Sequence, residues 1–177
     1  MSVWEDLPVY CYSPTVLGVV VAFFKMDGVP LALVGHRMMQ GNVCQRLAGR
    51  LLRKIVHITY GIEIHPSAEI GTHFYVGHIG HVVIGEKVKI GNNCTILHFF
   101  TLGAAGSGAR RGYPQLGDNV YVGAHAVVIG DITIGNHVTI GAASVVTKSM
   151  PDYAVCAGNP ARILRIKLPK ETPSCVE

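Results

Sequence analysis

The stretch VYVGAHAVVIGDITIGNHVTIGAASVV, residues 120–146, contains the repeat that decides the fold. Within it an aliphatic residue returns every six positions and is usually followed by glycine. With two interruptions, the same spacing holds at thirteen positions: Ile64, Ile70, Val76, Ile84, Ile90, Ile96, Leu102, Leu116, Val122, Val128, Ile134, Ile140 and Val146. An amphipathic helix needs a period of about 3.6 residues and an exposed strand a period of about 2, so neither explains this pattern.

Six residues make one flat side of a triangular coil, whose aliphatic residue points inward and whose glycine helps the corner turn. Small or apolar residues follow the aliphatic positions four residues later, at Ala68, Val88, Cys94, Val120, Ala126, Ile132 and Val138. Three sides make a coil of about eighteen residues, so residues 64–151 hold roughly five coils. The sequence therefore predicts a mainly β fold, a left-handed parallel β-helix of hexapeptide repeats.

Two segments break the six-residue spacing. The segment Gly77–Val83, GHIGHVV, shifts the frame by two residues. The segment Gly103–Gln115, GAAGSGARRGYPQ, leaves the frame altogether, and its glycines and arginines predict an extruded loop over residues 103–115. Insertions in a solenoid tend to lie on its working face, so we expect function near these two segments.

The flanking segments lack the repeat. Residues 1–60 are expected to be helical, with candidate helices at Pro14–Lys25, Pro30–Gln40 and Asn42–Ile58, and with Asn42 as an N-cap. After Pro151, the segment AGNPARILRIK predicts a turn and a short helix or strand, followed by a polar tail. The expected organisation is a helical segment (1–60), the β-helix (61–151) and a C-terminal segment (152–177).

Composition narrows the functional classes. Of 177 residues, 49% are hydrophobic and only 15% are charged, which suits a protein that hides flat faces in an oligomer. The net charge of +4 is mild, and no basic stripe interleaved with aromatic residues supports nucleic-acid binding. Five widely spaced cysteines without a CxxC pair indicate reduced thiols.

The N-terminal segment bears on localisation. The start, MSVWEDLP, is acidic where a signal peptide would be basic. The apolar run Val16–Phe24 has nine residues, too few to span a bilayer, although an interfacial role stays open. A cytoplasmic protein with no membrane span is predicted.

Several segments together resemble the serine acetyltransferases, and most of all their short relatives from polysaccharide and specialised metabolism. They are GIEIHPSAEIG (61–71), the GH at 77–78, TLG (101–103), the extruded loop, VYVGAHAVVIGDITIG (120–135), IGAASVV (140–146) and AGNPAR (157–162). The resemblance implies a CoA-dependent O-acetyltransferase. Such an enzyme moves an acetyl or similar acyl group from acyl-CoA to a hydroxyl of a small amino-acid-like or sugar-like acceptor. It also implies acetyl-CoA as co-substrate, no metal, and a homotrimer with the cofactor groove between subunits.

The same resemblance implies that His78 is the general base and that Glu63, at the family's usual Asp position, is its acidic partner. Their spacing of fifteen residues plus the local frame shift is close to one coil, so we expect them to lie one above the other. A neutral imidazole can take a proton from an attacking hydroxyl, and a carboxylate would orient it. The alternative is that His78 fills a corner and Glu63 is solvated.

By position, the resemblance implies cofactor contacts at Gly103, Ala124, Ala142, Lys148 and Arg162. The two alanines would let a pantetheine arm lie close to the backbone, and the two cations would attract phosphates. Tight corners also need small residues, and exposed cations are often only solvated, so these alternatives remain open.

On the acceptor side the sequence departs from the family. The family's acceptor-binding Arg-His pair corresponds to Gly112 and Tyr113, and its acceptor-side Asp to Ser13. The candidate acceptor residues are therefore Ser13, Tyr113, Arg110 and Arg111, the arginines being suited to an anion or else solvated. These departures predict that L-serine is a poor acceptor, with true serine O-acetyltransferase activity as the alternative.

Three further interpretations complete the set. The C-terminus, SCVE, lacks the terminal Ile by which serine acetyltransferases dock to cysteine synthase, so that partner is not expected. A zinc hydratase of the carbonic-anhydrase type would use three histidines, and His73, His78, His81 and His98 are clustered in the sequence. A trimeric scaffold without catalysis is the third possibility.

Overall fold

The computed structural model describes residues 28–78, 80–105 and 112–168. The expected helix Pro14–Lys25 and three acceptor candidates, Ser13, Arg110 and Arg111, lie outside the described residues. Within the described part, no helix is both long and apolar enough to cross a membrane.

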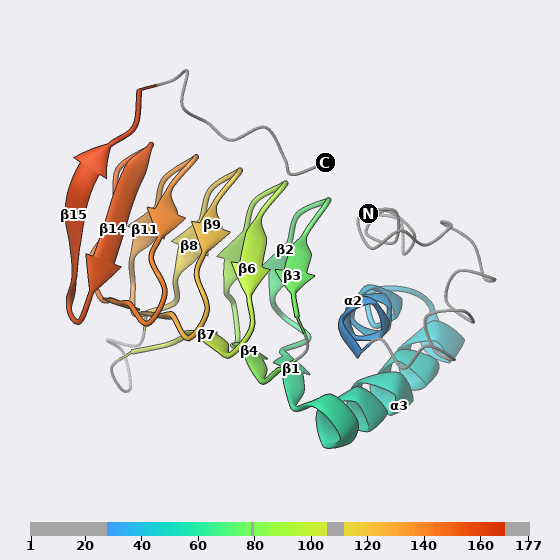
Figure 1. Ribbon diagram of the computed structural model, residues 1–177. Helices are drawn as coiled ribbons and strands as arrows, with labels where there is room; N and C mark the ends of the chain where they lie inside the picture. Colours follow the sequence, from blue (N-terminus) through green and yellow to red (C-terminus); the bar gives the residue numbers. More distant parts are fainter. Residues whose placement is uncertain (1–27, 79, 106–111, 169–177) are drawn as a thin grey trace.

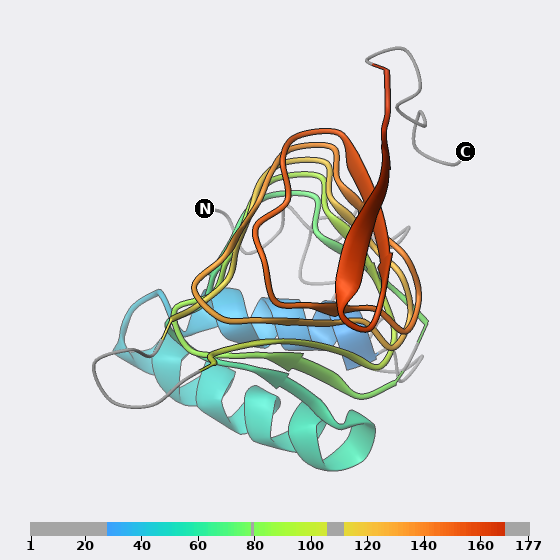
Figure 2. The same cartoon turned by 90° about the vertical axis from the view of Figure 1, so that its left-hand side faces the viewer.

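The chain from Ile62 onward winds into a triangular prism with three sheets, seen along its axis in Figure 2. Sheet A holds β1 (Ile62–Ile64), β4 (Val82–Ile84), β7 (Phe100–Gly103), β10 (Val127–Ile129) and β13 (Val145–Val146). Sheet B holds β2 (Glu69–Ile70), β5 (Lys89–Ile90), β8 (Gln115–Leu116) and β11 (Thr133–Ile134). Sheet C holds β3 (Tyr75–Gly77), β6 (Thr95–Leu97), β9 (Tyr121–Val122), β12 (Thr139–Ile140), β14 (Ala154–Gly158) and β15 (Ala161–Ile166). All strand pairs except β14–β15 are parallel, and the predicted left-handed β-helix is confirmed.

The pairing register explains both irregularities of the sequence. Val82 pairs with Ile62 on one side and with Phe100 on the other. The coil from Val82 to Phe100 has the regular length, and the coil before it is longer by the two-residue shift. Thr101 pairs with Val127, so the third coil exceeds the regular length by eight positions. These extra positions fall within residues 103–115, for which the sequence predicts the extruded loop.

All thirteen aliphatic positions of the repeat point into the prism, with exposed fractions no higher than the 5% of Leu116. The small or apolar residues four positions later are buried beside them, up to the 8% of Ile132. Burying each large aliphatic side chain contributes about 1.5–3 kcal/mol, so this single stack of side chains is the main source of the solenoid's stability.

The corner between sheets B and C carries a ladder of polar side chains that the repeat did not reveal. The backbone N–H of Asp118 donates to Asn136 Oδ1 at 2.8 Å, and the N–H of Asn136 donates to Asp152 Oδ1 at 2.8 Å. Each coil thus satisfies backbone groups of its neighbour, which matters because tight corners leave such groups outside the sheet ladders.

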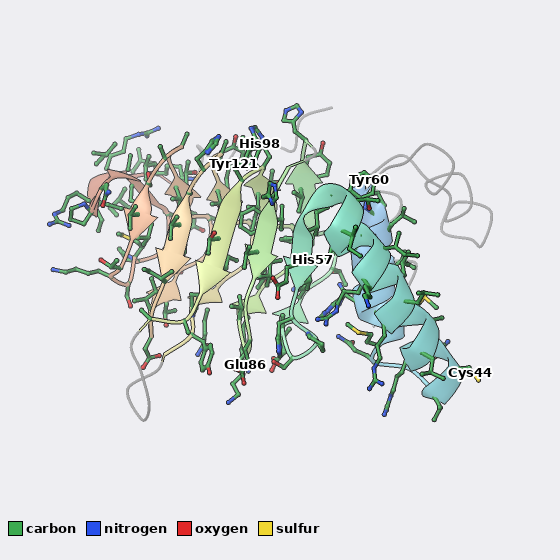
Figure 3. The ribbon with its side chains drawn as sticks, turned by 90° about the horizontal axis from the view of Figure 1, so that it is seen from below. Cys44, His57, Tyr60, Glu86, His98 and Tyr121 are labelled. Carbon is green, nitrogen blue, oxygen red and sulfur yellow. The ribbon has the colours of Figure 1, made fainter. Side chains whose placement is uncertain are left out.

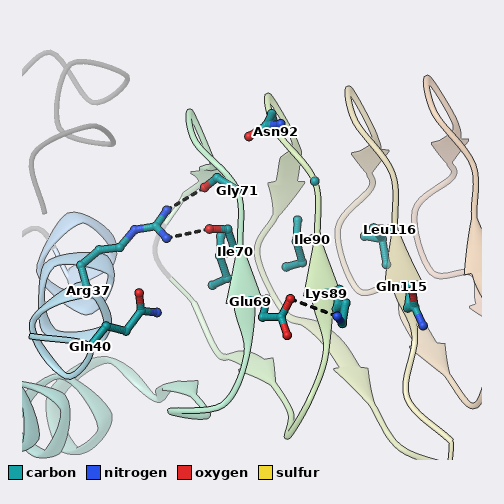
Figure 4. A pocket seen from close by; sticks show the side chains of 11 residues that line it. Arg37, Gln40, Glu69, Ile70, Gly71, Lys89, Ile90, Asn92, Gln115 and Leu116 are labelled. Atoms are coloured by element: carbon teal, nitrogen blue, oxygen red, sulfur yellow. Dashed lines mark hydrogen bonds and ion pairs between the residues drawn. The ribbon is translucent and has the colours of Figure 1, made fainter. Parts of the chain in front are cut away.

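Two helices cover the first coil: α2 (Gly28–Met38) and α3 (Val43–Tyr60), which lie side by side at one end of the prism in Figure 1. The predicted N-cap Asn42 is confirmed, because its side chain accepts from the N–H of Gln45 in a capping box. Arg37 of α2, buried at 3% exposure, donates from Nη1 to Ile70 O at 2.6 Å (Figure 4). A cavity of about 510 Å³ lies between α2 and sheet B.

The solenoid continues past its expected end at 151. Strand β14 pairs in parallel with β12, with Cys156 opposite Ile140, and β15 folds back on β14 as an antiparallel strand. The last coil is two positions shorter than the regular coil, so the six-residue spacing is lost there although the coil is kept. The expected short element after the turn is the strand β15.

Candidate active site

Aromatic rings from successive coils gather where sheet C turns into sheet A. We call this group, His78, His81, His98, Phe99 and His125, the histidine corner. The Phe99 ring stacks on His125, with centroids 4.9 Å apart, and on His81 at 5.9 Å. His98 meets the edge or face of three rings: His78 at 5.6 Å, Phe99 at 5.3 Å and His125 at 5.7 Å.

The corner holds His78 in an unusual backbone conformation. Its φ is +68°, and Phe99 and His125 have φ of +55° and +60° at the corresponding turns of the next coils. Left-handed backbone is unfavourable for residues other than glycine, so the coil geometry must impose it. The His78 side chain is exposed. This arrangement presents an accessible imidazole at the corner.

The expected position of Glu63 relative to His78 is wrong. Glu63 lies in the middle of β1, exposed on the outer side of sheet A, and it pairs with Val83. The residue one full coil beyond Glu63 is therefore Val83, and His78 comes before that coil is complete. No hydrogen bond or ion pair joins Glu63 to His78 within the described residues.

Two of the expected cofactor residues share the corner with His78. The parallel register of sheet C, continued into the turn, aligns one residue of each coil in a column: His78, His98, Ala124 and Ala142. Backbone bonds run up this column, from His125 N–H to His98 O at 3.1 Å and from Ala143 N–H to Ala124 O at 2.8 Å. The last two residues of this column, Ala124 and Ala142, carry only methyl side chains, so this part of the edge is open.

Arg162 lies at the same end of sheet C. It pairs with Ala157 on β14, the strand beside β12, and its guanidinium donates to Ala161 O at 3.1 Å. The side chain is exposed, so it can meet an anion next to Ala142. His78, Ala124, Ala142 and Arg162 thus follow one edge of the prism.

The other expected residues lie at the opposite edge, where sheet A turns into sheet B. Gly103 ends β7, the exposed Lys148 follows β13, and the extruded loop leaves from this edge. Figure 3 shows His98 and Glu86, which follows β4, at opposite margins of the solenoid. Within a single chain, the length of a sheet-A strand separates this edge from the edge that carries His78 and Ala124.

The base of the extruded loop is closely packed. Ala105 and Gly112 bond to each other through both backbone N–H groups, at 3.3 and 3.2 Å. A Cβ on Gly112 would collide with Asp131 Cβ and lie 2.6 Å from its backbone N, so no side chain fits there. Tyr113 donates its hydroxyl to Glu86 at 3.3 Å, and Lys87 Nζ lies 5.4 Å from the centre of the ring.

The buried thiol of Cys94 is not a plausible nucleophile. Burial raises its pKa to about 11, and its S–H donates to Gly117 O at 3.2 Å. The thiolate is the reactive form, so this thiol stays protonated and inert near neutral pH.

The zinc interpretation gains no support from the geometry. His73 has φ of +54° at the corner between sheets B and C, away from the histidine corner. Within the described ranges, no three His, Cys, Asp or Glu side chains come together closely enough to hold a metal ion.

Sequence reasoning overlooked Phe99 and His125 as parts of the site. Neither lies on the six-residue frame, and the shift of eight positions hides the alignment of His125 with Phe99 and His81. Superposing the coils in their true register, with Val82 on Phe100 and Thr101 on Val127, would have aligned His81, Phe99 and His125.

Comparison with known proteins identifies the family. Residues 113–148 match the family model described as bacterial transferase hexapeptide (six repeats). The serine acetyltransferase of Staphylococcus xylosus is 38% identical over 151 residues, 85% of this chain and 69% of that protein. The serine acetyltransferase structure from Neisseria gonorrhoeae has a TM-score of 0.72 at 29% identity, covering 94% of this chain and 65% of that one.

A serine acetyltransferase solved in complex with CoA is also similar, with a TM-score of 0.67 at 25% identity over 92% of this chain and 68% of that one. The chain thus spans about two thirds of the length of these relatives. The predicted class, a CoA-dependent O-acetyltransferase with acetyl-CoA as co-substrate, is confirmed by them. The histidine corner, the repeat and the extruded loop are accordingly features of a chain that belongs to the serine acetyltransferase family of hexapeptide-repeat acyltransferases.

Proposed function

We propose that this protein transfers the acetyl group of acetyl-CoA to the hydroxyl of L-serine, giving O-acetyl-L-serine and free CoA. The observation that carries the proposal is the 38% identity to a serine acetyltransferase over 85% of the chain. This favours serine over the broader class of acceptors that the sequence predicts.

In the proposed mechanism His78 acts as general base. Its imidazole takes the hydroxyl proton as the serine oxygen attacks the thioester carbonyl, and the tetrahedral intermediate then expels the CoA thiolate, which receives that proton. The acyl group passes directly to the acceptor, in keeping with the inert Cys94. Ala124 and Ala142 would flank the pantetheine arm, and Arg162 would attract a phosphate of the cofactor. Glu63 remains a candidate acidic partner of His78, although the strand register does not place the two residues one above the other.

The proposal includes assembly of the site between copies of the chain, most simply in a homotrimer. His78, Ala124 and Arg162 lie on one edge of the prism, whereas Gly103 and Lys148 lie on the other. The two groups lie at opposite ends of the sheet-A strands, so a site that uses both is most simply built between two copies. Packing the first edge of one copy against the second edge of its neighbour would unite them.

A second candidate acceptor is a hydroxylated small molecule other than an amino acid, such as a sugar. The packing of Gly112 against Asp131 favours it, because an acceptor-binding arginine has no room at that position. Tyr113, held by Glu86, then offers a ring and a hydroxyl where an imidazole would stand in the family. These groups suit neutral acceptors better than a carboxylate.

Product analysis tests the proposal and separates the two candidates. The protein is incubated with acetyl-CoA and an equimolar mixture of L-serine, homoserine, a hexose and a nucleotide sugar, and the products are identified by mass spectrometry. O-acetyl-L-serine as the main product supports the proposal. Acetylated sugar with no O-acetylserine would replace it with the second candidate.

A further inference from the structure

We propose that His98 is a positioning residue for His78. Its ring would fix the orientation of the base without itself exchanging the proton. This inference rests on the proposed function because it takes His78 as the base. The ring contacts of His98 that support it do not depend on that function.

His98 is the hub of the histidine corner. It contacts the His78 ring at 5.6 Å with an interplanar angle of 84°, an edge-to-face arrangement. On its other sides it contacts Phe99 at 5.3 Å and His125 at 5.7 Å. Edge-to-face ring pairs attract each other beyond the effect of area burial, which favours one orientation of an exposed ring.

Two further rings, those of Phe99 and His125, pack against His98 and restrict its movement. Phe99 and His125 stack with an interplanar angle of only 15°, and the N–H of His125 donates to His98 O. His98 is only partly exposed, whereas His78 is exposed. Of this pair, His78 is therefore the ring free to choose among rotamers, and His98 is the one that restricts it.

The nitrogens of His98 argue against a proton relay. Its Nδ1 atom is buried and has no hydrogen-bond partner among the described groups. A relay needs a partner on each ring nitrogen, one that gives a proton and one that takes it. A ring with one nitrogen closed off in this way contributes packing surface, and a phenyl ring of similar shape can supply that surface equally well.

Two substitutions of His98 are expected to have different effects on kcat. His98→Ala removes the support, and because a displacement of about 1 Å at a reacting group lowers the rate by roughly 10²-fold, kcat should fall about 10–100-fold. The KM for acetyl-CoA should be unchanged. His98→Phe keeps an aromatic edge against His78 and should retain kcat within about threefold of wild type.

A matched control removes an imidazole from a different corner. His137 also has positive φ, and it stacks on Tyr153 at 4.8 Å between sheets B and C. His137→Ala should leave kcat at the wild-type value. Circular dichroism and the melting temperature of each variant show that the fold persists, and the Phe variant keeps the test informative if the Ala variant unfolds.

The decisive experiment combines kcat with the ring resonance of His78, assigned through His78→Gln, in ¹H–¹³C spectra. The inference predicts that His98→Ala moves this resonance and lowers kcat, while His98→Phe restores kcat. A phenyl variant as slow as the alanine variant, or an alanine variant with wild-type kcat or an unmoved His78 resonance, would overturn it. A wild-type protein inactive with serine would count against the proposed function alone, because the spectra need no acceptor.

Discussion

At the scale of single residues, the proposed role of His78 gives the sharpest expectation. Removing a positioned general base typically lowers the rate about 10²–10⁴-fold. His78→Ala should therefore reduce kcat by that factor while the affinity for CoA stays nearly unchanged, since Ala124, Ala142 and Arg162 are the residues proposed to hold the cofactor. Thiol release gives kcat, and calorimetric titration with CoA gives the affinity.

Glu63→Gln provides the comparison. Glu63 lies opposite Val83 in the strand register and makes no hydrogen bond or ion pair with His78 among the residues that the structure describes, so its replacement should lower kcat less than His78→Ala does. An alanine variant at position 78 with wild-type kcat would place the base elsewhere, with the exposed His81 of the same corner as the next candidate.

Gly112 gives a second residue-level expectation. A Cβ at this position would collide with Asp131, including its backbone, which cannot move aside as a flexible side chain would. Gly112→Ala should therefore lower the free energy of unfolding by about 1–3 kcal/mol, the usual range for overpacking. Urea denaturation measures this, with Gly103→Ala as control, because a Cβ there meets nothing closer than 4.0 Å. Equal stability of the Gly112 variant and wild type would show that the loop base is loosely packed.

At the scale of elements, helix α2 carries a buried titratable group. Burial, and secondarily the charge of Arg37, lower the pKa of His36 from 6.5 to about 4. Below pH 6.5 the unfolded chain takes up a proton that the folded chain refuses, so the free energy of unfolding falls as the pH drops toward 4. Between pH 7 and pH 5 this loss is about 2 kcal/mol.

His36→Gln removes the titrating group and should flatten this part of the stability profile. Urea denaturation of the variant and the wild type at pH 7 and pH 5 measures the difference. A wild-type loss on acidification that the variant reproduces in full would show that His36 is not its source.

The elements also show how far sequence alone can go. The thirteen aliphatic positions predict the buried side of the coils from Ile64 to Val146, because a six-residue spacing admits only one arrangement of inward-pointing residues. The cap at Asn42 is likewise predicted, since its pattern is local. The predicted placement of Glu63 and His78 one above the other is wrong, because the sequence does not show how many residues the coil that contains the two-residue shift has. The stacking of His125 on Phe99 was missed for the same reason, since insertions between coils conceal which corner residues meet.

At the scale of the whole molecule, the division of the expected cofactor residues between two edges leads to an assembly. We expect a homotrimer with three times the mass of the 19.0 kDa chain. Multi-angle light scattering in line with size-exclusion chromatography measures that mass. A monomer with full activity would rule out a site shared between copies, because neither edge alone presents both groups.

The central claim is acetyl transfer from acetyl-CoA to serine, and steady-state thiol release tests it most directly. The wild-type protein is assayed with saturating acetyl-CoA and increasing L-serine, with His78→Ala as the background. We predict a kcat/KM for L-serine of about 10⁴ M⁻¹s⁻¹ or higher, within the usual range of enzymes on their own substrates. Thiol release that does not depend on serine, or that equals the His78→Ala background at every serine concentration, would contradict the account.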